Sequence, residues 1–133
     1  MSTRAVAINL KIPDNAAYTA LVTLRRLGID VAGVERSQIV RFADAPETQA
    51  LVTAVEKDES LYNPNKHRVT VLEADAPRAG EVWIVQDDAE RPVGWRLYRA
   101  PGVPASLDLL TQAAERLLCN PAIERAIFPR SHG

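Results

Sequence analysis

The sequence is poor in the residue types that most often carry out chemistry. It has one cysteine, Cys119, so a disulfide within the chain is impossible and a cysteine-based metal site would need other ligands. Its two histidines, His67 and His132, have no partner at metal-ligand spacing. The six glycines are scattered and form no phosphate-binding loop. These absences lead us to expect no catalytic residue, no metal and no cofactor.

The chain also lacks an excess of charge of one sign and long apolar runs. Sixteen basic and 17 acidic residues give a formal net charge of -1, which offers no general attraction to nucleic acid or to an anionic membrane. No apolar run reaches the length of a membrane span, and no signal-peptide pattern opens the sequence. We therefore expect a cytoplasmic protein that binds neither nucleic acid nor membrane. Low net charge does little to oppose self-association, so we expect a homo-oligomer, and among oligomers we expect a dimer.

What the sequence does have is the patterning of a globular α+β domain. Hydrophobic residues make up 47% of 133 residues and aromatic residues only 5%, so the core must consist mainly of aliphatic side chains. Residues 5–12 alternate in polarity with the period of a strand. Residues 16–27 place their apolar side chains on one helical stripe. Asp14 or Asn15 can cap this helix, and Gly28 is suited to end it.

A second strand region and a second helix follow. Gly33 or the Arg36-Ser37 pair can bend residues 30–43 into two strands. Residues 44–47 (Asp-Ala-Pro-Glu) form a capping-box pattern, which indicates the start of a helix. A strand rich in β-branched residues is predicted at 67–73.

The order of these elements predicts the fold class. Residues 1–74 have the βαββαβ order of a ferredoxin-like unit, an antiparallel sheet with both helices on one face. Residues 80–129 predict a partial second ββαβ repeat packed with the first, and residues 130–133 a tail. The expected elements of the second part are strands at 82–86 and 93–99 around a polar turn at 87–90, a helix over 107–118 and a last strand at 123–128.

One short segment of the chain occurs twice. A shift of 57 residues places Leu118-Cys119-Asn120-Pro121 on Leu61-Tyr62-Asn63-Pro64, and Arg125 on Arg68. Two explanations stay open. The second half is a copy that has lost its first helix, or the match is shared turn chemistry, because asparagine before proline is an ordinary helix exit.

Arginines and tryptophans supply the remaining candidate residues. Arg36 and Arg41 suit a phosphate or an acidic partner if they lie at sheet edges, although their spacing puts them on opposite faces of a regular strand. Trp83 and Trp95 lie in the predicted strand pair and are expected to stack across it, or to mark a partner surface if they are exposed.

Two segments carry a family resemblance. Residues 17–40 (AYTALVTLRRLGIDVAGVERSQIV) and residues 115–128 (ERLLCNPAIERAIF) resemble the first helix and strand, and the C-terminal Asn-Pro helix exit and last strand, of the PurS family. That family is the small subunit of bacterial formylglycinamide ribonucleotide amidotransferase. The sequence departs from the family in its shorter loop at 13–16, in its greater length, and in Arg36-Ser37-Gln38, which replaces a Val-Gly-Lys turn.

The resemblance implies a non-catalytic accessory protein of purine biosynthesis. Such subunits dimerise through their sheets and bridge the glutaminase and the synthetase of the amidotransferase. Arg36, Gln38 and Arg41 become candidate contacts with a partner or a phosphate, because they match the family's central turn.

Two alternatives accompany this interpretation. In the first, residues 1–43 and 105–128 form one unit with an insertion between them. In the second, the chain is a ferredoxin-like regulatory domain that binds a small metabolite at a dimer interface.

Overall fold

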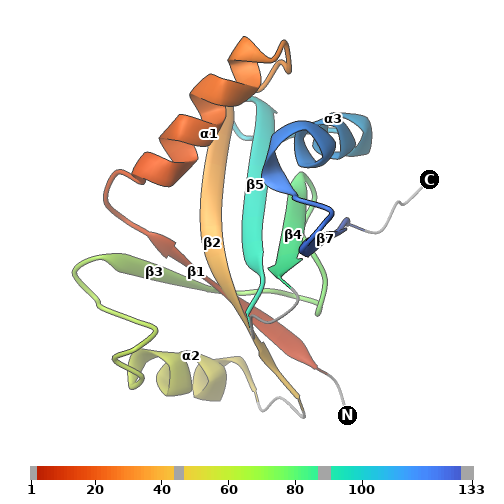
Figure 1. Ribbon diagram of the computed structural model, residues 1–133. Coiled ribbons are helices and arrows are strands. Elements are labelled where there is room, and N and C mark those ends of the chain that lie inside the picture. The colour runs from red at the N-terminus through yellow and green to blue at the C-terminus, as the bar shows by residue number, and fades with distance from the viewer. Residues whose placement is uncertain (1–2, 44–46, 87–90, 130–133) are drawn as a thin grey trace.

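The computed structural model describes residues 3–43, 47–86 and 91–129. Within them the chain forms an α+β fold, as the sequence predicts, and its strands join in one seven-stranded antiparallel sheet (Figure 1). The elements, in chain order, are β1 (Arg4–Leu10), α1 (Asn15–Arg26), β2 (Gly33–Phe42), α2 (Thr48–Glu56), β3 (His67–Val71), β4 (Glu81–Gln86), β5 (Val93–Ala100), β6 (Val103–Pro104), α3 (Leu107–Ala113), the π-helical turn η1 (Ala114–Leu118) and β7 (Glu124–Ile127).

Helix α1 begins and ends where the sequence predicts. The Asp14 carboxylate oxygen Oδ1 accepts hydrogen bonds from the backbone N–H groups of Ala16 and Ala17, at 3.0 and 3.2 Å. These bonds satisfy two of the donors that the first turn of a helix leaves without partners. After the helix, Gly28 takes a φ of +84°, which glycine adopts at little cost.

Strand β2 corrects one expectation. Residues 33–42 form a single strand of ten residues, and neither Gly33 nor Arg36-Ser37 divides it. The physical reason is pairing on both sides: β2 pairs with β1 through residues 37–42 and with β5 through residues 33–38, without a register shift. The first half of the chain therefore contributes three strands, and the strand order does not confirm a ferredoxin-like topology.

The start of α2 differs from the prediction as well. Glu47 is its N-cap residue and makes no side-chain capping bond, while residues 44–46 of the predicted capping box lie outside the described residues. The polar turn predicted at 87–90 also lies outside them.

The strands follow the order β3-β1-β2-β5-β4-β7, and the short β6, which the sequence did not predict, pairs with β5. β7 pairs with β4 and β3 pairs with β1. The arrangement of 1–43 and 105–128 as one unit is therefore wrong, because the last strand joins the other half of the sheet.

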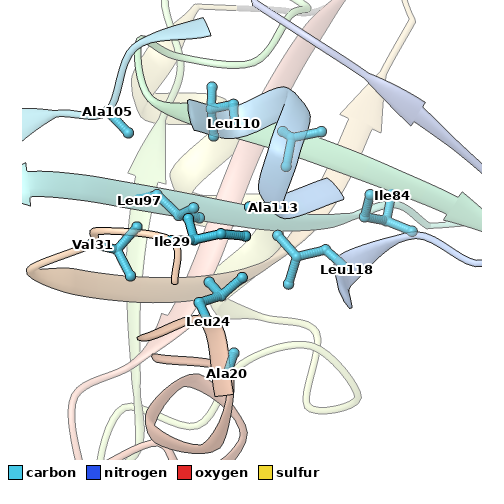
Figure 2. Packing of buried hydrophobic residues seen from close by; sticks show 11 residues of the cluster. Ala20, Leu24, Ile29, Val31, Ile84, Leu97, Ala105, Leu110, Ala113 and Leu118 are labelled. Carbon is cyan, nitrogen blue, oxygen red and sulfur yellow. The ribbon is translucent and has the colours of Figure 1, made fainter. Parts of the chain in front are cut away.

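All three helices cover one face of the sheet, here called the helix face. Val6 and Val40 are register partners and pack against α2, and Val34 and Leu97, on the same side of the sheet, belong to the core beneath α1 and α3. Figure 2 shows this second core, with side chains from α1 and α3 meeting those of β4 and β5. Its buried members are Ala20, Leu24, Ile29, Val31, Val82, Ile84, Leu97, Ala105, Leu110, Ala113 and Leu118.

The opposite face, here called the connection face, is crossed by residues 72–80 on their way from β3 to β4. In Figure 1 this connection runs behind the sheet, with α1 and α3 in front. Leu72 packs there against Ala5, Ala7 and Ile39, which are all fully or almost fully buried. A short chain segment thus shields a face that no described helix covers.

The two tryptophans do not stack. Val82, not Trp83, is the register partner of Trp95, so the two indole side chains point to opposite faces. Trp83 is 1% exposed on the connection face, and Trp95 is half-buried on the helix face. Trp83 therefore cannot mark a partner surface.

The two halves of the sheet have matching strand orders. β3-β1-β2 in the first half corresponds to β7-β4-β5 in the second. In the first half, Ile8 of the middle strand pairs with Val69 and Gln38. In the second half, Ile84 takes the same place and pairs with Ala126 and Val93. Ala126 lies 57 residues after Val69, which is the shift that aligns the repeated segment. Gln38 and Val93, which correspond to each other, are themselves register partners at the centre of the sheet.

The Asn-Pro turns before β3 and β7 also match bond for bond. The side chains of Asn63 and Asn120 accept hydrogen bonds from the N–H groups of Asn65 and Ala122, at 2.9 and 3.1 Å. The backbone N–H groups of Asn63 and Asn120 each donate to the side chain four residues later, to His67 Nδ1 at 2.9 Å and to a Glu124 carboxylate oxygen at 2.8 Å. The repeated segment thus occupies the same place and the same conformation in both halves.

Candidate functional site

A polar hollow opens on the helix face, beside the central Gln38–Val93 pair. Its volume is about 300 Å³. It lies at the C-terminal end of β1 and the N-terminal end of β3, next to the N-terminus of α1 and the start of β5. The lining residues are Ile8, Asn9, Leu10, Asp14, Arg36, Ser37, Gln38, His67, Arg91 and Val93.

Two of the three candidate contacts from the sequence meet in this hollow. Arg36 and Gln38 are two residues apart on β2, so both point to the helix face. Arg41 points to the connection face, where its guanidinium pairs with Asp75. This ion pair raises the pKa of Arg41 above its ordinary value, mainly through the hydrogen bond to Asp75. The opposite-face placement that the spacing predicted for Arg36 and Arg41 is confirmed.

Asp14 links the helix terminus to the hollow. Its Oδ1 caps α1, and its Oδ2 lies 3.4 Å from the Nε of Arg36, which donates to it. The Arg36 side chain is 40% exposed and that of Asp14 15%. The carboxylate therefore holds the guanidinium at the rim of the hollow, while the bond itself is long and leaves further N–H donors of Arg36 for another group.

Arg91 brings a second guanidinium to the same hollow, and the sequence did not single it out. With Arg36 and Asp14 it gives the lining of the hollow two positive charges and one negative charge. Outside the hollow, hydrogen bonds from Ser60 and then the charge of Arg91 lower the pKa of Asp58, so Arg91 also faces this carboxylate. An excess of positive charge among polar neighbours favours a bound group that carries negative charge.

His67 contributes a hydrogen-bond donor. Because its Nδ1 accepts the bond from Asn63 N–H, the neutral ring carries its proton on Nε2. The structure places a half-buried, oriented imidazole at the wall of the hollow.

Cys119 has no feature that would activate its thiol. Cys119 is half-buried, and burial, followed by the charge of Glu124, raises the pKa of its thiol, which disfavours the nucleophilic thiolate. Among residues 3–43, 47–86 and 91–129, no group of three or more His, Cys, Asp or Glu side chains is placed to hold a metal ion. No helix in the described part of the chain is long and apolar enough to cross a membrane.

In the described part of the chain, the connection face holds a buried carboxylate, that of Glu81, which pairs with Arg78. Glu81 is 0% exposed and accepts four hydrogen bonds: from Arg78 N, Nε and Nη2, and from the indole Nε1 of Trp83, at 2.8 to 3.2 Å. Both carboxylate oxygens of Glu81 accept hydrogen bonds from residues two or three positions away in the sequence. We therefore assign this carboxylate a structural role.

The fold and the hollow define a small α+β protein whose antiparallel sheet has matching halves and a cationic hollow near its centre. Comparison with protein-family models, with curated proteins and with solved structures found no match.

Proposed function

We propose that this chain is a PurS-like accessory protein without catalytic residues of its own, which bridges the glutaminase and the synthetase of a formylglycinamide ribonucleotide amidotransferase. The observation that carries the proposal is the matching of the two halves of the sheet, in strand order and in the hydrogen bonds of the Asn-Pro turns. Residues 115–128, one of the two segments that carry the family resemblance, contain the second of these Asn-Pro exits.

The finer organisation that we propose is one and a half units in a single chain. Residues 1–74 form the first unit, a variant of the ferredoxin-like unit with one strand fewer, and residues 80–129 form the second. In the second unit no described helix lies between β4 and β5 as α1 lies between β1 and β2, while α3 with η1 stands in the place of α2. The β2–β5 pairing then takes the part of a dimer interface within one chain.

Contact with two partners requires two separate surfaces. Arg36 and Gln38 lie on the helix face, and Arg41 lies on the connection face. We propose that one partner contacts the first pair of residues and the other contacts Arg41. Because both arginines are partly exposed, an acidic partner surface can reach each of them.

The experiment is co-purification of the full chain with the two enzyme subunits. The tagged wild-type chain is expected to retain both. Arg36→Glu with Gln38→Ala is expected to lose one subunit and keep the other, and Arg41→Glu is expected to do the reverse. Arg26→Gln, which changes an exposed residue of α1, is the control and is expected to retain both.

Two results would contradict the proposal. A wild-type chain that retains neither subunit rules out the accessory role. If both enzymes bind the wild-type chain and every variant equally, the assigned contact surfaces are wrong.

A further inference from the structure

The hollow at the centre of the helix face combines charge, hydrogen-bond donors and enclosure in a way that neither the sheet nor the core requires. Its arginines, amides and imidazole come from β1, β2, β3 and the start of β5, four places far apart in the sequence. Backbone pairing and the two apolar cores already hold these strands together on either side of it. We propose that this hollow binds a small metabolite that carries an oxyanion, either a phosphate or a carboxylate, together with hydroxyl groups.

The charges of the hollow specify the oxyanion. Guanidinium groups bind phosphate and carboxylate through paired N–H donors. Arg36 and Arg91 both line the hollow. Among the described residues, only the Nε–H of Arg36 has a bond, the 3.4 Å contact with Asp14. The Nη donors of Arg36 are thus the atoms assigned to the oxyanion.

The neutral groups specify the remainder of the ligand. Gln38 and Asn9 offer amide donors and acceptors, and His67 offers its Nε2–H donor. Hydroxyl groups can use both kinds of partner, whereas an aliphatic ligand would leave them unpaired. The apolar side chains of Ile8 and Val93 line the same hollow and suit the carbon skeleton of the ligand.

The size of the hollow limits the ligand. A volume of about 300 Å³ is at the lower end of the range for small-molecule sites, about 300 to 1,000 Å³. The ligand class is therefore the size of a short-chain phosphate ester or a dicarboxylic acid. The inference does not depend on the accessory function, because it concerns the isolated chain.

The test is titration calorimetry of the full chain with inorganic phosphate, glycerol 3-phosphate and succinate, each against sodium chloride at equal ionic strength. At least one oxyanion is expected to bind saturably, with a dissociation constant below about 10 mM. Arg36→Gln and Arg91→Gln are each expected to weaken that binding about tenfold, because each removes charge-assisted hydrogen bonds.

Arg26→Gln is the matched control, since it removes the same charge from the far end of α1, about 18 Å along the helix from Asp14. Unfolding midpoints of all three variants establish that they are folded. Binding of the phosphate compounds alone identifies a phosphate site, and binding of succinate alone identifies a carboxylate site. Absence of saturable binding by all three probes, or equal weakening by Arg26→Gln, overturns the inference. Co-purification with enzyme subunits plays no part in this outcome, so the two proposals fail separately.

Discussion

The contribution of the buried Glu81 carboxylate to the stability of the fold can be tested by substitution. We expect Glu81→Gln to destabilise the protein, because the carboxylate is fully buried and accepts four hydrogen bonds, three of them from Arg78. The glutamine keeps one acceptor oxygen in place of Oε1. Its amide nitrogen, however, replaces Oε2 and meets the Nη2 donor of Arg78 at 2.8 Å, donor against donor.

The size of the loss follows from two limits. Hydrogen bonds to charged groups contribute about 1.5 to 3 kcal/mol, and breaking a buried ion pair costs about 3 to 5 kcal/mol. The side chain of Arg78 is 25% exposed, so the released guanidinium regains part of its hydration. We therefore expect a loss of about 2 to 3 kcal/mol in the free energy of unfolding. For a chain of 133 residues the unfolding entropy is about 0.28 kcal/mol per kelvin, so the melting temperature should fall by about 9 °C.

Urea unfolding followed by tryptophan fluorescence is the assay, because Trp83 lies against the altered group. Glu73→Gln, at an exposed position, is the control and should change stability by no more than about 0.5 kcal/mol. A loss for Glu81→Gln as small as that of the control would refute the argument.

Three further predictions concern Gly94, Tyr98 and Cys119. Gly94→Ala should lower the free energy of unfolding by about 1 to 3 kcal/mol, because the added Cβ would lie 2.9 Å from Glu81 Oε2 and 3.1 Å from a buried isoleucine. Gly33→Ala, whose Cβ would meet only ordinary contacts, is the control, and equal losses of the two variants in urea unfolding would contradict the prediction. Burial and then the hydrogen bond to Glu35 raise the pKa of Tyr98 above 10.0, so the stability that this group contributes is complete below about pH 10 and is lost as the pH rises through the folded pKa. Tyr98→Phe should therefore flatten the alkaline decline of the unfolding free energy, and an unchanged slope would refute this. The raised pKa of Cys119 predicts that its reaction with a disulfide reagent reaches half its maximal rate at a higher pH in the folded chain than in urea, and a midpoint equal or lower would argue against it.

The sequence predicted the local elements well because their signals are local. Alternating polarity, the Asp14 cap and the Gly28 exit each act within a few residues of the element that they define, and β1 and α1 match the prediction closely. The unbroken course of β2 depends instead on two partner strands, β1 and β5, so no signal within residues 33–42 could reveal it.

The tryptophan pair shows how one residue of register reverses a conclusion. The β4–β5 pairing places Val82 opposite Trp95, and a slip by one residue would have brought the two indoles face to face. Both side chains have strand-like neighbours, so only the register decides between a stacked pair and two separate faces.

The candidate site was predictable in part. Arg36 and Gln38 were marked by the family resemblance, and strand alternation separates them from Arg41. Arg91 and His67 reach the same hollow through strand pairing between distant segments, and nothing in their own surroundings in the sequence points there.

The central pairing of β2 with β5 lies inside one covalent chain, which changes how the protein responds to dilution and to mutation. Two separate subunits that paired through these two strands would dissociate at low concentration. Here β2 and β5 belong to one chain, so their effective concentration does not fall on dilution. Within one chain, each surface position belongs to one half of the sheet only. A substitution at Arg36 therefore alters one hollow per chain, and each half of the sheet is free to change its own surface without imposing that change on the other.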